Sequence, residues 1–180
     1  MKLHDTQAPN PRRVRIFLAE KGITNEVTIV PVNIGTAEQH TEEFKAKNPF
    51  SALPVLELNN GTTIAESVSI CRYLENIYPG TPLLGESAIE QAQVDMWSRR
   101  SEAAVLSNVG TYFHFGTDGL DAAAYKNKDW AEHCLETLNK VLPIFNIQLR
   151  DNDFLAGDFF SIADITLLCA LDFALYLKIV

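Results

Sequence analysis

The strongest constraint on the fold is a change of pattern at residues 78–87, where the chain reads YPGTPLLGES. Proline and glycine at this density indicate a linker, because they interrupt helices and strands. Before this segment, strand-like and helical segments alternate, whereas every later apolar repeat has the period of a helix. The sequence therefore predicts two domains, at residues 1–79 and 89–180, joined by residues 80–88.

The first domain is predicted to be an α/β unit. Four apolar segments have the length and the β-branched content of strands: residues 2–4, 26–32, 54–58 and 62–65. A helix that ends at Gly22 and a polar, exposed helix at residues 37–46 separate the first three, and the Asn-Asn-Gly turn at residues 59–61 joins the last two into a hairpin. A helix capped by Ser67 follows. This βαβαββα order predicts a mixed four-stranded sheet, the thioredoxin-like arrangement.

The second domain is predicted to be all-α. Apolar residues recur at helical spacing over residues 89–115 and 127–149. A last helix is expected to begin at Ser161-Ile-Ala-Asp164, which has the spacing of a capping box with Asp in place of the usual Glu. Two aspartates interrupt the apolar run 162–180, so this run suits a buried core helix better than a membrane span.

Charge and cysteine content exclude several classes of function. The chain of 180 residues has a formal net charge of −8, a pI of about 4.9 and no basic block, which argues against nucleic acid and anionic membranes as partners. The three cysteines, Cys71, Cys134 and Cys169, are far apart and odd in number, as expected of reduced thiols in a cytoplasmic protein. The four histidines lie in different predicted elements, so no metal site is expected.

Four stretches, in order and at matching distances, give the whole chain a resemblance to cytosolic glutathione transferases. They are APNPRRVRIFLAEKGI at residues 8–23, NPFSALPVLEL at 48–58, GTTIAESVSICRYLENIYP at 61–79 and LAGDFFSIADI at 155–165. The Asn-Pro turn and the stretch YFHFGTDGLD at residues 112–121 look closest to the atypical yeast-type and bacterial members, which lack a catalytic Tyr, Ser or Cys. Such members continue for one or two more helices, so the C-terminal end of the second domain is expected to be missing.

The resemblance implies that glutathione binds along one edge of the N-terminal sheet. Ser67, at a helix N-terminus, would hold the γ-glutamyl carboxylate, and Glu66 would accept from the γ-glutamyl ammonium group. In the family a cis peptide bond precedes the matching Pro54, and Leu53 would pair with the cysteinyl backbone like an added strand. His40 stands where the family often places a cation for the glycyl carboxylate. The residues alone are also consistent with Ser67 as a simple N-cap, Pro54 as a trans proline and His40 as a solvated surface residue.

No Tyr, Ser or Cys stands where most classes contact the glutathione sulfur, because the turn after the first strand reads Thr6-Gln7-Ala8-Pro9-Asn10. Asn10 is the best remaining candidate, since an amide donor beside a helix N-terminus would lower the pKa of the thiol. The alternative, that Asn10 only caps the first helix, stays open. The second candidate is His114, because yeast-type members use a Ser and a His to hold a water that assists the thiol. Gly110 occupies the position of that Ser here.

The predicted function is conjugation of the glutathione thiolate to small electrophiles, with glutathione as co-substrate and no metal. The family implies a detoxification enzyme of the cytoplasm that forms a homodimer across both domains. The sequence is also consistent with two alternatives. One is a glutathione-dependent disulfide reductase or peroxidase, and the other is a non-enzymatic protein on the same fold that acts in translation or stress response.

Overall fold

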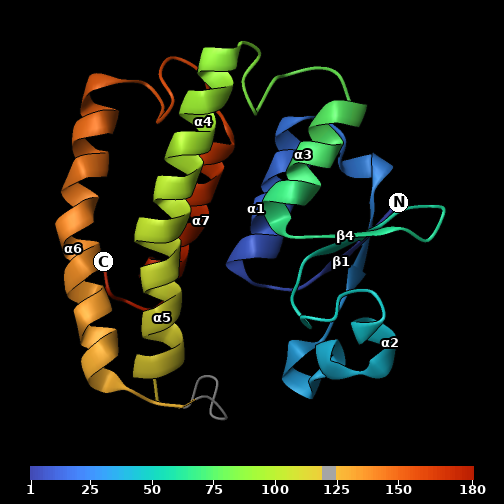
Figure 1. Ribbon diagram of the computed structural model, residues 1–180, viewed down its shortest axis with the longest axis horizontal. Helices are drawn as coiled ribbons and strands as arrows, with labels where there is room; N and C mark the ends of the chain where they lie inside the picture. The colour runs from blue at the N-terminus through green and yellow to red at the C-terminus, as the bar shows by residue number, and fades with distance from the viewer. Residues whose placement is uncertain (119–124) are drawn as a thin grey trace. The chain divides into compact units, whose positions relative to one another are not determined.

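The computed structural model describes residues 1–118 and 125–180, which divide into two compact units, Met1–Leu83 and Leu84–Val180 (Figure 1). Part of the YFHFGTDGLD stretch, residues 119–121, lies outside the described residues. We propose that residues 80–88 are the linker between the two domains.

The N-terminal unit contains the predicted mixed sheet. Its strands are β1 (Lys2–Asp5), β2 (Thr28–Pro31), β3 (Val55–Glu57) and β4 (Thr63–Ala65), in the order β2-β1-β3-β4. The strands β1 and β2 are parallel, whereas β3 is antiparallel to both β1 and β4. Helix α1 (Pro9–Glu20) packs against α3 (Ser67–Ile77) (Figure 1). The α/β prediction for this unit is therefore confirmed.

The predicted helix at residues 37–46 is wrong for most of its length. Two 3₁₀ turns, η2 (Ile34–Thr36) and η3 (Glu38–His40), precede a short α2 (Glu42–Lys45). The turns are separated by Ala37, whose left-handed φ of 59° breaks a continuous helix. A further 3₁₀ turn, η1 (Thr24–Glu26), delays the second strand to Thr28.

The C-terminal unit is all-α, as predicted. The expected helix at 89–115 is an uninterrupted helical run made of α4 (Ala88–Arg100), a π-helical stretch η4 (Ser101–Leu106) and α5 (Ser107–Gly116). Helices α6 (Lys128–Asp151) and α7 (Ile162–Tyr176) complete the unit (Figure 1). Its core includes Trp97, Leu138, Phe145, Leu155 and Leu167. Thus α7 is a core helix, as its composition indicates.

Candidate active site

One end of the N-terminal sheet gathers the segments that carry the predicted site residues. His4 of β1 pairs with Val55 at the start of β3, and Val55 in turn pairs with Ala65 at the end of β4. Because β1 and β2 are parallel, Asp5 at the end of β1 also lies beside Pro31 at the end of β2. The chain therefore leaves β1, β2 and β4, and enters β3, at the same end of the sheet.

The first of these segments leads into α1, which begins two residues earlier than predicted. Ala8 is the N-cap, with extended φ and ψ of −150° and 161° and no side-chain capping bond, and Pro9 is the first helical residue. The prediction that Asn10 caps this helix is wrong, because the fixed φ of Pro9 already suits the first helical position. Asn10 is exposed and is the second residue of the helix, so it lies past the capping position.

Two prolines leave the first turn of α1 with few amide donors. Neither Pro9 nor Pro11 has an N–H group, and the Arg12 amide already donates to the Ala8 carbonyl at 3.1 Å. The backbone amide of Asn10 is therefore the one N–H group that this turn can offer to an anion. Together with the side-chain amide, Asn10 concentrates the donor capacity of the helix terminus on a single residue.

An ion pair holds the turn between β1 and α1. Nη1 of Arg15 contacts both carboxylate oxygens of the buried Asp5, at 2.6 and 2.7 Å, and donates to the Thr6 carbonyl at 3.1 Å. Arg15 Nη2 lies 3.4 Å from Oε1 of Gln7. These bonds fix the backbone just before Ala8. This ion pair was not predicted, although an Asp at the end of a strand followed ten residues later by an Arg on the next helix indicates it.

Ser67 begins α3 but does not cap it. The N-cap is Glu66, which makes no side-chain capping bond and has a φ of 65°, while Ser67 is the first helical residue. The predicted N-cap role of Ser67 is therefore wrong. Its hydroxyl oxygen instead accepts a 2.7 Å bond from Nη1 of Arg13, and both side chains are buried. Because the first intrahelical bond runs from the Ile70 amide to the Glu66 carbonyl, the amides of the first turn lack intrahelical acceptors.

The Leu53–Pro54 peptide bond is cis, which confirms the prediction for this step. Leu53 packs against the buried cluster of Val32, Phe44 and Val55. This packing holds the Leu53 side chain in place. Leu53 lies shortly before β3, at the end of the sheet where α1 and α3 begin.

The two predicted histidines are exposed and lie in different units. His40 ends the 3₁₀ turn η3 in the N-terminal unit, and His114 lies on α5 in the C-terminal unit. Phe113, beside His114, packs against Phe173 with ring centroids 5.3 Å apart. A Cβ built on Gly110, one helical turn before His114, meets no atom within 4 Å, so a serine would fit there. The roles of both histidines stay predictions.

Glu57 is the centre of a charge cluster on the sheet. His4 Nε2 lies 2.8 Å from Glu57 Oε2, Lys47 Nζ lies 3.1 Å from the same oxygen, and Lys2 Nζ lies 3.7 Å from Oε1. The hydrogen bond with His4, followed by the bond from Lys47, lowers the pKa of Glu57 to about 2. The cluster ties the segment after α2 to β1 and β3.

We expect Glu57 to make folding stability depend on acid pH. Its folded-state pKa of about 2 lies below the unfolded value of about 4.3, so its contribution is complete above about pH 5 and is lost as the pH falls through about 2. Glu57→Gln should therefore flatten the fall of unfolding free energy between these pH values, measured by urea denaturation at several pH values. The exposed Glu43→Gln should keep the wild-type slope; equal slopes for wild type and Glu57→Gln would contradict the prediction.

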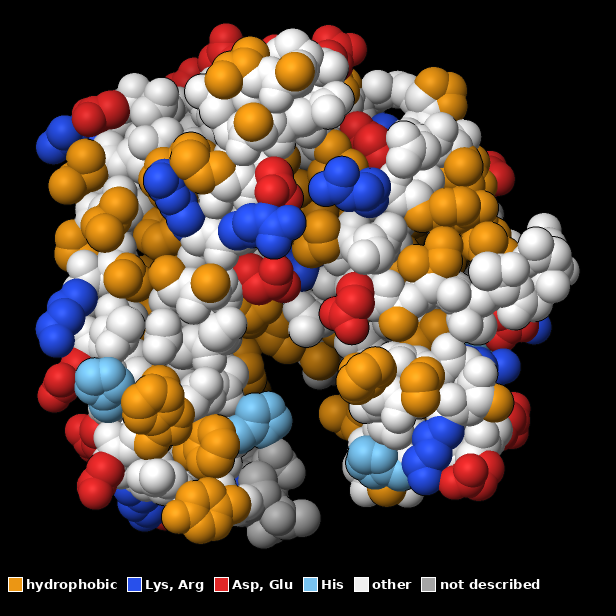
Figure 2. Space-filling model, viewed as in Figure 1, with side chains coloured by type: hydrophobic (Ala, Val, Ile, Leu, Met, Phe, Trp, Pro, Cys, Tyr) orange, Lys and Arg blue, Asp and Glu red, His pale blue; other side chains and the backbone are white. Residues whose placement is uncertain are grey.

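On the face shown in Figure 2, Lys and Arg side chains are interspersed with Asp and Glu. All three cysteines are free and buried, and burial raises the pKa of the Cys134 thiol.

Among the described residues, none of the helices combines the length and hydropathy needed to cross a membrane. Within the same residues, no group of three or more His, Cys, Asp or Glu is arranged to hold a metal ion.

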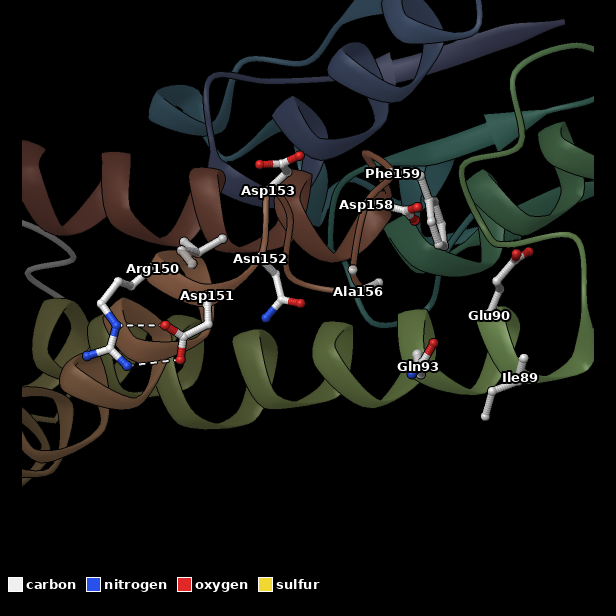
Figure 3. A pocket seen from close by; sticks show the side chains of 12 residues that line it. Ile89, Glu90, Gln93, Arg150, Asp151, Asn152, Asp153, Ala156, Asp158 and Phe159 are labelled. Atoms are coloured by element: carbon white, nitrogen blue, oxygen red, sulfur yellow. Dashed lines mark hydrogen bonds and ion pairs between the residues drawn. The ribbon is translucent and has the colours of Figure 1, made fainter.

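A separate open cavity of about 800 Å³ lies in the C-terminal unit (Figure 3). It is formed where the start of α4 meets the end of α6 and the following loop. Its lining includes four acidic residues: Glu90, Asp151, Asp153 and Asp158. The Arg150 guanidinium is occupied by Asp151, with N–O distances of 2.7 and 2.9 Å (Figure 3). None of the predicted site residues lines this cavity.

Comparison with known proteins identifies the family. The model of the glutathione S-transferase N-terminal domain matches residues 8–77, and that of the C-terminal domain matches residues 100–180. Glutathione S-transferase 2 of Saccharomyces cerevisiae is 39% identical over 183 residues, which cover 99% of this chain and 78% of the yeast protein. The chain therefore belongs to the glutathione S-transferase family, as predicted.

The fold comparison agrees with this assignment. The crystal structure of a glutathione S-transferase domain-containing protein from Marinobacter aquaeolei VT8 matches with a TM-score of 0.95 and 43% identity, over 100% of this chain and 89% of that one. The predicted likeness to yeast-type and bacterial members is confirmed by these two relatives. Elongation factor 1-gamma 2 of Oryza sativa is also similar, at 33% identity over 131 residues, 73% of this chain and 30% of that protein.

Proposed function

We propose that this protein is a glutathione transferase that ionises the glutathione thiol at the start of α1 and conjugates it to small electrophiles. The observation that carries the proposal is the meeting of two helix N-termini at one end of the sheet. The first turn of α1 offers Asn10 as its donor, and the first turn of α3 offers Ser67. Helix N-termini favour anions, and glutathione has both a thiolate and carboxylates to place there.

In the proposed complex, the γ-glutamyl end of glutathione lies at α3. The Ser67 hydroxyl and amide hold its carboxylate, and the exposed Glu66 accepts from its ammonium group. The cysteinyl backbone pairs with Leu53 beside the cis Pro54. His40 receives the glycyl carboxylate. These contacts place the sulfur near the beginning of α1.

The proposed reaction uses the sulfur of glutathione itself as the nucleophile. Donors at Asn10 stabilise the thiolate, which attacks the electrophilic carbon, forms the new S–C bond and displaces the leaving group, or adds to an activated double bond. The enzyme forms no covalent intermediate, so its contribution is thiol ionisation and the positioning of two substrates. His114 is proposed to assist proton removal from the thiol.

The experiment that tests this function is a pH titration of the ultraviolet thiolate band of bound glutathione. We expect the pKa of the bound thiol to lie below the value of about 8.5 for an ordinary cysteine thiol. We also expect the protein to turn over members of a panel of aryl and alkyl electrophiles. Binding with an unshifted thiol and no turnover would favour a binding protein, a possibility raised by the similarity to elongation factor 1-gamma 2. Turnover of mixed disulfides or peroxides alone would favour the reductase alternative. Absence of binding would refute the proposal.

We also propose that the protein is a cytoplasmic homodimer, with Phe50 at its interface. Phe50 is 84% exposed, yet hydrogen bonds fix the backbone of its loop. The buried Asn48 accepts from the Phe50 amide at 3.1 Å and donates to the Ala52 carbonyl at 2.9 Å. An ordered loop that presents a bare phenyl ring suits a contact with a second copy. The three reduced, buried cysteines support the cytoplasmic location.

Phe50→Ser should weaken the dimer by about 100-fold or more. Each buried phenyl ring contributes about 1.5–3 kcal/mol, and a twofold-symmetric dimer contains the contact twice. Sedimentation equilibrium over a range of concentrations measures the change. Ile34→Ser, which alters another exposed apolar side chain of the N-terminal unit, should leave the equilibrium unchanged. Equal dissociation constants for wild type and Phe50→Ser would contradict the proposal.

A further inference from the structure

Arg13 is a fully buried arginine that the proposed chemistry does not yet use. Its side chain is 1% exposed, and it lies on the face of α1 that also buries Val14 and Phe17. A buried guanidinium is costly to desolvate, so arginines are seldom enclosed unless they are hydrogen-bonded. One of its bonds joins Nη1 to the Ser67 hydroxyl oxygen at 2.7 Å. The buried charge is thus directed at a residue of the proposed glutathione site.

This bond determines which way the serine hydroxyl can act. A guanidinium has donors but no acceptor, so the Ser67 oxygen must be the acceptor. The hydroxyl hydrogen is then free to be donated to another group. Because Ser67 is the first residue of α3, its own helix has no carbonyl one turn earlier that could accept this hydrogen. Arg13 therefore leaves Ser67 as a donor at a helix N-terminus, which is the arrangement that a carboxylate requires.

The same bond places a permanent positive charge behind the hydroxyl. Buried charges are weakly screened, so a carboxylate that accepts from Ser67 is also attracted by Arg13 without touching it. The neighbouring Glu66, exposed and held at a φ of 65°, offers a negative group beside the serine. A donor backed by positive charge next to a carboxylate matches the two ends of an α-amino acid head group.

We propose that Arg13 is a positioning residue that makes the site selective for ligands with a free α-carboxylate on the γ-glutamyl group. The proposal rests on the proposed glutathione site and adds the origin of its selectivity. Arg13 acts through Ser67, whose hydroxyl it orients and polarises. A purely structural Arg13 would instead support binding of all ligands equally.

The test compares glutathione with 4-aminobutanoyl-cysteinyl-glycine, which lacks only the γ-glutamyl α-carboxylate. Isothermal titration of the full chain gives the ratio of the two dissociation constants. We expect the wild type to favour glutathione by tenfold or more. Arg13→Met should bring the ratio to within about threefold of unity, chiefly by weakening glutathione. Arg13→Gln, which keeps an N–H donor but loses the charge, should give an intermediate ratio and fits the buried space if Arg13→Met does not fold.

The control is Arg72→Met, which makes the same change of net charge at an exposed position of α3 and should keep the wild-type ratio. If both Arg13 variants bind the two ligands with the wild-type ratio, Arg13 is only structural and the inference is wrong, while the proposed function stands. A wild type that binds both ligands equally also overturns the inference alone. If the wild type binds neither ligand, the proposed function fails and the inference fails with it.

Discussion

Replacing Asn10 with alanine is expected to raise the pKa of the bound glutathione thiol by about 1–2 units and to lower kcat/KM at neutral pH by about 10-fold or more. A hydrogen bond to a charged group contributes about 1.5–3 kcal/mol, and one pKa unit corresponds to about 1.4 kcal/mol. The effect should be this large because Pro9 and Pro11 remove the other donors of the first turn. Titration of the thiolate band and steady-state kinetics measure the two changes.

Two further variants sharpen this prediction. Asn10→Asp replaces the donor by a negative charge of nearly the same shape, so it should raise the thiol pKa further than Asn10→Ala does. Asn139→Ala, at an exposed position of α6, should leave the titration unchanged. A wild-type titration in both Asn10 variants, together with a raised thiol pKa in His114→Ala, would transfer the role to His114.

The elements that sequence analysis predicted well are specified by local chemistry. The hairpin of β3 and β4 follows from two apolar segments around an Asn-Asn-Gly turn. The cap of α7 follows from Ser161 and Asp164 at the correct spacing. The helix prediction for residues 37–46 is wrong because the polar sequence of this segment gives no indication that Ala37 adopts a left-handed conformation. Its only buried residue in α2, Phe44, instead fixes the chain by a tertiary contact.

At the candidate site, the residue types were predictable but their partners were not. The predicted start was two residues late for α1 and one residue late for α3, which assigned capping roles to Asn10 and Ser67, although Ala8 and Glu66 are the N-caps. Helix boundaries depend on backbone angles that a cap-forming residue type alone does not determine.

The burial of Arg13, the partner of Ser67, is indicated by a spacing pattern in the sequence. Arg13, Phe17 and Lys21 are spaced by four residues and therefore share one face of α1. The side chain of Lys21 is also almost enclosed, with Nζ 2.9 Å from Glu75 and 2.9 Å from the Thr81 carbonyl. A charged residue in register with buried apolar ones indicates a buried ion or hydrogen-bond partner. Only the three-dimensional fold shows that one such partner is Ser67.

Replacing Asp164 with alanine is expected to destabilise the C-terminal unit by about 3 kcal/mol or more. Its carboxylate accepts from the Ser161 amide at 2.9 Å, the Ser161 hydroxyl at 3.0 Å and the Leu155 amide at 2.8 Å. Ser161 and Leu155 are fully buried, so alanine would leave two enclosed amides without their acceptor. Each buried amide that loses its acceptor costs about 1–3 kcal/mol. Thermal and urea unfolding measure the loss.

The matched control is Asp129→Ala, which removes an exposed first-turn aspartate from α6 and should cost less than about 1 kcal/mol. Asp164→Asn keeps one carbonyl oxygen as an acceptor and should fall between wild type and Asp164→Ala. We expect this order of stability losses because the Asp164 carboxylate joins the loop before α7 to α7 itself. Leu155 of that loop and Leu167 of α7 belong to the same core. A cost for Asp164→Ala no larger than that for Asp129→Ala would show that the Leu155 and Ser161 amides find other acceptors.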